Sequence, residues 1–187
     1  GAMYRAATWR ALHHEIPLDD TPNLVKSTRE MRLEFRNGRV FVDDTDVSDA
    51  IRTPEVTRSI RALDSLPGVR EHLGRLQREL GASRPTVAEG RDMGTVIFPD
   101  AICKVFLDAT IDERARRRAN EFSGAAESAD IELVKAEIEA RDSNDRKRET
   151  APLRAAPDAH RLDTTTMTID EVVDAIVELV REATSDG

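Results

Sequence analysis

Two capping boxes, each following a short apolar segment, constrain the fold of this chain more than any other feature. The sequence Thr-Ile-Asp-Glu occurs at residues 110–113 and again at 168–171. In such a box the Thr and Glu side chains bond free backbone N–H groups, so each box predicts the start of a helix. The segments before them, CKVFLDA (103–109) and HRLD (160–163), have the character of strands. Strand, helix, strand, helix in this order predicts βα units on a parallel sheet, and hence an α/β fold.

The first half of the chain predicts a β-hairpin between helices. Asn37-Gly38 is a strong two-residue turn signal, and it separates MRLEF (31–35) from VFV (40–42). We interpret the hairpin and the helices after it as a lobe inserted into the α/β core. The other expected elements are a helix from Met3 to His13, a loop over 14–23, helices opened by Pro54 and by Pro67, and a short strand over 86–88.

Composition excludes several classes of partner and site. The formal net charge of −8 argues against nucleic-acid binding, which needs a positive field to neutralise phosphates. No apolar run reaches the roughly 18 residues that span a bilayer, so we expect no membrane partner and a cytoplasmic protein. The single cysteine, Cys103, excludes an internal disulfide and a multi-cysteine zinc site. We expect it to be a buried, inert thiol, and we assign no metal ligands.

The basic residues are strongly biased toward arginine, with 24 Arg and four Lys. Arginine holds phosphate and carboxylate groups with a planar, bidentate fork. Arg114, Arg117 and Arg118 recur at i, i+3 and i+4, so they share one face of the expected helix. One interpretation is a solvated face paired with Glu113 and Glu121. The other is a movable clamp on phosphates, favoured by the small polar segment 122–130 that follows and would suit a lid.

A second group of arginines lies near the end of the helix expected to begin around residue 131. Arg141, Asp145 and Arg148 recur at i, i+4 and i+7. A carboxylate held between two guanidinium groups stays ionised, and it can accept from sugar hydroxyls while the arginines bind phosphate. The alternative interpretation is an exposed ladder of ion pairs that contributes little to stability.

A third candidate is the stretch EGRDMGTVIFPDA (89–101). Arg91 and Asp92 stand between Gly90 and Gly94 and directly before an apolar run. We expect the glycines to take positive φ and to let the backbone approach a ligand at the end of a strand, where α/β sheets bind ligands. The alternative is a structural bend with an internal Arg91–Asp92 ion pair.

Several segments, in this order and spacing, resemble bacterial cytidylate kinase. They include EGRDMGTVIFPDA, FLDATIDERARRR, EIEARDSNDRKRETAPLRAAPDA and LDTTTMTIDEVVDAI, together with GAMYRA at the start. The resemblance covers essentially the whole chain. It implies the parallel-sheet core of P-loop nucleoside monophosphate kinases with an inserted monophosphate lobe and an Arg-rich lid. It also implies one kinase-like domain over 1–187, with core segments 1–23, 84–112 and 149–187, the lobe at 24–83, and the lid and following helix at 113–148.

The resemblance further implies a reaction and a set of site residues. The family transfers the γ-phosphoryl group of ATP to CMP or dCMP, giving CDP or dCDP, and it uses Mg²⁺. The implied catalytic residues are Arg91, Arg114, Arg117 and Arg118. The implied contacts are the CMP phosphate for Arg5, Arg91 and Arg141, the sugar or base side for Asp145 and Arg148, and the cytosine edge for Arg70 and Asp92.

One family motif is absent from these 187 residues. The family uses G-x-x-x-x-G-K-[ST], whose backbone amides hold the ATP phosphates while the Lys neutralises them. None of the four lysines here follows a glycine. We therefore expect that the phosphate loop and the N-terminal core strands are missing from this chain and that its kinase activity is impaired. A non-catalytic CMP-binding or interaction module is the alternative.

The base preference is a separate question, because Arg61 and Asn144 depart from the family pattern. The resemblance leads us to expect a small hydroxyl residue in place of Arg61 and an arginine in place of Asn144. A kinase for another pyrimidine monophosphate, such as UMP, is the resulting alternative. The expected partners are small nucleotides, and the family implies a monomer, with self-association open for a shortened chain.

Overall fold

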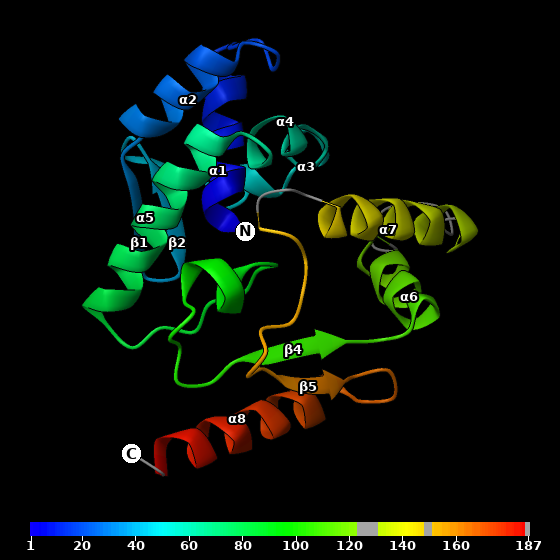
Figure 1. The fold of residues 1–187 in the computed structure, drawn as a ribbon. Coiled ribbons are helices and arrows are strands. Elements are labelled where there is room, and N and C mark those ends of the chain that lie inside the picture. The colour runs from blue at the N-terminus through cyan, green and yellow to red at the C-terminus, as the bar shows by residue number, and fades with distance from the viewer. Residues whose placement is uncertain (123–130, 148–150, 186–187) are drawn as a thin grey trace. The chain divides into compact units, whose positions relative to one another are not determined.

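The computed structural model describes residues 1–122, 131–147 and 151–185 (Figure 1). Residue contacts divide the chain into two compact units, Gly1–Gly90 and Arg91–Gly187. Helices and the parallel strand pair β4–β5 confirm the predicted α/β class. Among the described residues, every helix is too short or too polar to span a lipid bilayer.

Unit 1 is organised around its first helix, α1, which contacts α2, α3, α4, η1 and β2. The inner face of α1 consists of Met3 and the small residues Ala6, Ala7 and Ala11, which lets its neighbours approach closely. The elements of unit 1 are α1 (Ala2–His13), α2 (Thr21–Glu30), β1 (Leu33–Arg36), β2 (Arg39–Val42), β3 (Thr45–Asp46), η1 (Ala50–Arg52), α3 (Pro54–Ser59), α4 (Arg61–Asp64) and α5 (Pro67–Ser83).

The predicted hairpin is confirmed. β1 pairs with β2 in antiparallel register from Leu33↔Val42 to Arg36↔Arg39, and β3 adds a short third strand. Asn37 and Gly38 both have positive φ, 50° and 75°, as the tight turn requires. Alternate side chains of β2, Val40 and Val42, enter the core because successive strand residues face opposite sides.

α2 is an element that the sequence analysis missed, since residues 14–23 were expected to form a loop. Asp20 caps the helix by accepting from the backbone N–H of Asn23 at 3.2 Å, and Pro22 lies in its first turn. This is the same start signal that correctly predicted α3 from Thr53 and Pro54. The prolines at 17 and 22 were weighed as breakers, whereas the second of them opens a helix.

Unit 2 carries the predicted βα units. Its elements are the π-helical turn η2 (Met93–Ile97), β4 (Val105–Asp108), α6 (Ile111–Phe122), α7 (Ile131–Arg146), β5 (His160–Asp163) and α8 (Ile169–Ser185). β4 and β5 are parallel, with register from Val105↔His160 to Asp108↔Asp163 (Figure 1). The second capping box forms in full, because Glu171 N–H donates to Thr168 Oγ1 at 3.3 Å and Thr168 N–H donates to Glu171 Oε2 at 2.8 Å. At the first box Glu113 N–H donates to Thr110 Oγ1 at 3.4 Å, but Thr110 N–H donates to Thr165 Oγ1 at 3.0 Å, so only the threonine half of the box forms.

Three local predictions are wrong in the described residues. Residues 86–88 form no strand, and Val87 is 98% exposed, because a lone extended segment has no neighbouring strand to complete its hydrogen bonds. Gly90 and Gly94 do not take positive φ; Gly38 is the glycine that does. Cys103 is partly exposed instead of buried.

The unit 1 core generates a stability prediction. Leu73 of α5 is fully buried in the cluster that includes Leu24 and Leu63. Leu73→Ala should lower the free energy of unfolding by about 2–5 kcal/mol, from lost apolar transfer and the cavity left behind. Urea unfolding followed by the fluorescence of Trp9, the single tryptophan, reports on this unit.

The matched control lies on the same helix. Glu71→Ala, at an exposed position of α5, should change the free energy of unfolding by less than about 0.5 kcal/mol. Equal losses for the two variants would contradict the assignment of Leu73 to the core.

Candidate functional site

The Arg91 guanidinium is ion-paired with the Asp145 carboxylate in unit 2. Arg91 stands just before η2, and Asp145 lies near the end of α7, so the contact joins two elements that are 54 residues apart. The Asp145 side chain is 4% exposed and that of Arg91 is 31% exposed. A buried charge is tolerated only when paired, so this contact positions both side chains. Neither interpretation of residues 89–101 named Asp145 as a partner of Arg91.

Asp92 begins the turn that follows Arg91. Its carbonyl oxygen accepts from the backbone N–H groups of Val96 at 2.9 Å and Ile97 at 3.2 Å, and the residue is 9% exposed. A π-helical turn of this kind is rare and is often found at functional sites. The hydrogen bonds from Val96 and Ile97 therefore restrain the backbone of Asp92, and with it the position of the adjacent Arg91.

α6 carries the predicted arginine face, and its members have different partners. Arg114 is ion-paired with Asp142 of α7, whose residue exposure is 9%. Within the described part of the chain, the Nε of Arg114 is buried and has no hydrogen-bond acceptor. A buried donor without an acceptor costs about 1–3 kcal/mol, so Arg114 keeps one N–H for which a ligand oxygen would be a favourable partner. Arg118 is half-buried on the same helix.

Arg117 is attached to the ends of the parallel strands. Its Nε donates to Glu113 at 2.7 Å, its Nη1 donates to Thr164 Oγ1 at 3.0 Å, and its Nη2 donates to the Thr164 carbonyl at 2.5 Å. Thr164 Oγ1 in turn donates to the carbonyl of Asp108 at 3.0 Å. Arg117 therefore lies at the carboxyl ends of β4 and β5, the edge where open α/β sheets bind ligands.

Glu113 accepts from two arginines at once. Arg116 bonds it through Nε at 2.8 Å and Nη2 at 2.7 Å, and Arg117 adds a third bond. The hydrogen bonds from Arg116 and Arg117 lower the pKa of Glu113 from 4.5 to about 2. The interpretation of a face paired with Glu113 thus holds for Arg117 and for Arg116, which the sequence analysis did not single out.

Two predicted site residues belong to unit 1. Arg5 on α1 donates through Nη1 to Thr57 Oγ1 at 2.8 Å and to the Ile51 carbonyl at 3.2 Å. Arg70 on α5 donates to the Asp64 carbonyl at 3.2 Å, and its guanidinium carbon lies 6.0 Å from the centre of the Tyr4 ring. In these contacts both guanidinium groups donate to neutral oxygens.

The remaining predicted site residues are an exposed arginine and residues outside the described part of the chain. Arg141 is exposed on α7. Arg148 and the expected lid segment 123–130 lie outside the described residues, as does the side chain of Glu121. The sequence analysis missed Asp142 and Thr164 as partners of the arginine face, although Asp142 directly follows Arg141 in the motif that drew attention to α7.

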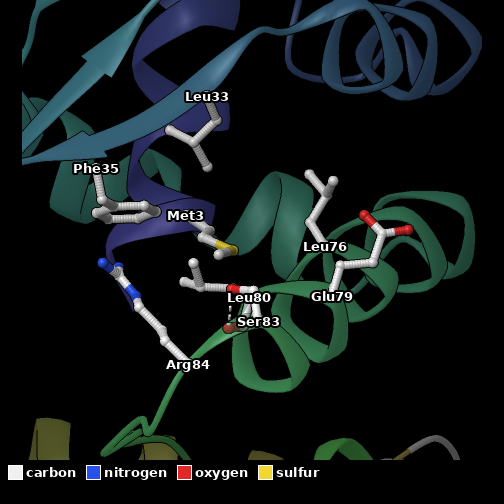
Figure 2. A pocket seen from close by; sticks show the side chains of 8 residues that line it. All are labelled: Met3, Leu33, Phe35, Leu76, Glu79, Leu80, Ser83 and Arg84. Carbon is white, nitrogen blue, oxygen red and sulfur yellow. Dashed lines mark hydrogen bonds between the residues drawn. The ribbon is translucent and has the colours of Figure 1, made fainter.

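A pocket of about 370 Å³ in unit 1 is lined by none of the predicted site residues. Figure 2 shows its walls, formed by Met3, Leu33, Phe35, Leu76, Glu79, Leu80, Ser83 and Arg84. Ser83 Oγ donates to the Leu80 carbonyl at 2.8 Å. The walls are mainly apolar and include a single arginine, a poor match for a phosphate-bearing ligand.

Glu113 generates a prediction about pH. A carboxylate whose folded pKa is depressed stabilises the fold fully above its unfolded pKa of 4.5, and that stabilisation is lost as pH falls toward 2. The stability difference between the protein and Glu113→Gln should therefore be largest above pH 4.5 and should shrink steadily between pH 4.5 and 2. Urea unfolding of both proteins at several pH values measures it. A difference that is constant over this range would contradict the Glu113–arginine contacts.

Comparisons with known proteins agree with one another. Residues 1–182 match the family described as cytidylate kinase. The chain is 42% identical over 182 residues to a cytidylate kinase of Rhodopirellula baltica and 44% identical over 186 residues to one of an Exiguobacterium species. These matches cover 97% of this chain and 80% and 83% of the relatives.

A relative of a different kind is a bifunctional pantoate ligase/cytidylate kinase of a Synechococcus species, 43% identical over 189 residues. That match covers 97% of this chain but 35% of the relative, so the chain spans about a third of that protein's length. With a family match over almost all of its residues and relatives above 40% identity, the chain belongs to the cytidylate kinase family.

Proposed function

We propose that this protein acts in the transfer of the γ-phosphoryl group of ATP to CMP or dCMP, giving CDP or dCDP. The observation that carries the proposal is the pairing of Arg91 with the buried Asp145 beside the buried Asp92. Phosphoryl transfer depends mainly on positioning and on neutralising charge, and it needs no protein nucleophile. An ordered arginine next to two carboxylates supplies those requirements for an acceptor nucleotide.

The proposed roles of the individual residues are those that the resemblance to cytidylate kinases implies. In unit 2, Arg91 and Arg141 bind the acceptor phosphate, Asp145 and Arg148 face its sugar or base side, and Asp92 faces the cytosine edge. In unit 1, Arg5 contacts the phosphate and Arg70 the cytosine edge. Arg114, Arg117 and Arg118 act from the lid on the charge that spreads over the transferring group. Asp92 and Asp145 can accept hydrogen bonds from N–H or O–H groups of the nucleotide, because an ionised carboxylate is only an acceptor.

The Arg91–Asp145 ion pair supports the assignment of Arg91 to the acceptor phosphate, because it holds the guanidinium group in an ordered position before the phosphate binds. Holding a guanidinium in one geometry lowers the ordering cost of binding. An incoming phosphate offers two oxygens to the same fork, so the carboxylate can be released to bond a hydroxyl. The same side chains thus serve the unliganded and the liganded protein.

The donor side is proposed only in outline. ATP with Mg²⁺ is the donor that family membership suggests, yet these 187 residues contain no G-x-x-x-x-G-K-[ST]. Among residues 1–122, 131–147 and 151–185, no group of three or more His, Cys, Asp or Glu could hold a metal ion. Within the described residues we assign no group to ATP or Mg²⁺. We propose that turnover by these residues alone is weak.

A first test measures CMP affinity by isothermal titration calorimetry. Arg91→Lys keeps the charge but removes the bidentate fork. It should weaken CMP binding at least about tenfold, the effect of losing one charge-assisted hydrogen bond. The matched control is Arg181→Lys on α8, an exposed residue paired with Glu178, which should stay within about twofold. Equal affinity for all three proteins would contradict the role of Arg91.

A second test measures turnover by coupled release of ADP from ATP in the presence of CMP. The proposal expects less than about 1 s⁻¹ from these residues, below the roughly 1–100 s⁻¹ typical of kinases. Turnover in that typical range would contradict the proposed impairment and support the kinase assignment outright. CMP binding with no turnover would favour a non-catalytic CMP-binding module.

Arg61 motivates a second candidate, a kinase for another pyrimidine monophosphate such as UMP. Arg61 is exposed at the start of α4, and Asn144 is exposed on α7. An arginine can donate to uracil carbonyl oxygens, which cytosine offers in smaller number. Tighter binding of UMP than of CMP in the same titrations would select this candidate.

A further inference from the structure

Lys104 has an unusual environment for a lysine. Its side chain is 8% exposed, although lysines are rarely buried without a partner. Its ammonium group donates to the Asp158 carboxylate at 2.5 Å, and its backbone carbonyl accepts from His160 N–H at 2.9 Å. Side chain and backbone both attach Lys104 to the segment that leads into β5.

The stem of Lys104 lies against the π-helical turn η2. A Cβ atom added to Gly94 would lie 3.4 Å from Lys104 Cδ, 3.5 Å from Lys104 Cγ and 3.7 Å from Ala156 Cβ. These are ordinary van der Waals distances, so the Cα of Gly94 faces the lysine stem and Ala156, with space for about one methyl group between them. Ala156 is 7% exposed and accepts from the N–H of Ala159, within the short turn that also carries Asp158.

The turn supported in this way is the one that begins at Asp92. Because Asp92 accepts from the N–H groups of Val96 and Ile97, a shift of Gly94 also shifts Asp92 and the adjacent Arg91. The ion pair holds the stem from one end, since the Asp158 carboxylate restrains the ammonium group. The pKa of Asp158 is lowered, with the Lys104 hydrogen bond as the main cause, in agreement with a formed pair.

We propose that Lys104, held by Asp158, is a positioning residue that supports the Gly94 turn and thereby sets how Asp92 meets the pyrimidine edge of the acceptor nucleotide. The proposal rests on the proposed function, because the ligand is the CMP assigned to that site. Lys104 itself touches no substrate. Its effect is on the ratio of affinities for cytosine and uracil nucleotides, because that ratio depends on the position of Asp92.

Three variants separate the stem from the charge. Lys104→Ala removes both, Lys104→Met keeps an unbranched apolar stem without the ammonium group, and Asp158→Asn keeps the lysine but weakens its anchor. Lys26→Met is the matched control, because Lys26 is exposed on α2 with Glu30 at 4.0 Å.

The first measurement needs no ligand. Hydrogen exchange of the Val96 and Ile97 amides reports on the turn, because both donate to Asp92. Exchange should be at least about tenfold faster in Lys104→Ala, a few-fold faster in Lys104→Met and Asp158→Asn, and unchanged in the Lys26→Met control. Unchanged exchange in Lys104→Ala would overturn the proposal whether or not the chain binds CMP.

The second measurement is the ratio of the CMP and UMP dissociation constants by calorimetry. A loss of folded protein affects both constants equally and cancels in the ratio. The preference for one base should fall at least about threefold in Lys104→Ala and be partly restored in Lys104→Met. Faster exchange of the Val96 and Ile97 amides together with an unchanged ratio of dissociation constants would also overturn the proposal, because Lys104 would then support the turn without affecting recognition of the base. If the unsubstituted protein binds neither nucleotide, the proposed function itself fails.

Discussion

The ion pair between Arg91 and Asp145 connects the two parts of unit 2 on which the candidate site depends. Removing a charged pair from water is costly, and the mutual attraction offsets that cost only if the geometry is good. The pair is therefore weak evidence for stability but strong evidence for a defined position, because losing either partner leaves a buried charge. The Arg91–Asp145 pair thus fixes the position of α7 relative to the start of the turn η2. The Leu153 N–H donates to the Asp145 carbonyl at 2.9 Å, so the segment after α7 is attached to the same residue.

The same arrangement recurs along α6. Arg114 is paired with Asp142, and Arg116 and Arg117 share Glu113, so these three arginines of α6 already have carboxylate partners in the absence of a nucleotide. A chain with a net charge of −8 can thus present a cationic site locally without a positive surface overall. The carboxylates hold the guanidinium groups in ordered positions, and a phosphate, which offers more acceptor oxygens, competes for the same donors.

Prediction from sequence succeeded where a signal is local. The Asn37-Gly38 turn and the helix starts at the two Thr-Ile-Asp-Glu sequences depend on contacts within a few residues, and all were found. The strand β5 was found from the order of the βα units, although its partner β4 lies far earlier in the chain. α2 was missed through the weighing of Pro22, not through lack of a signal. Residues 86–88 have strand composition but no strand, because a strand exists only with a neighbour to pair with. Arg114 and Arg117 were singled out from the sequence, whereas their partners Asp142 and Thr164 were not, since partners across a fold leave no periodicity in the sequence.

The stretch EGRDMGTVIFPDA illustrates the limit most clearly. Its glycines were expected to take positive φ, a property of the residue itself, but Gly94 does not, and its Cα faces the Lys104 stem and Ala156. This packing depends on Lys104 and Ala156, which lie 10 and 62 positions further along the chain, so it could not be inferred from the glycine itself. Asp92 and Arg91 occupy one end of the turn, Lys104 supports its middle, and Asp145 holds Arg91 from α7. Because each constraint comes from a different element, the geometry of the pair is a property of the whole of unit 2, and substitutions far from the nucleotide can alter its recognition.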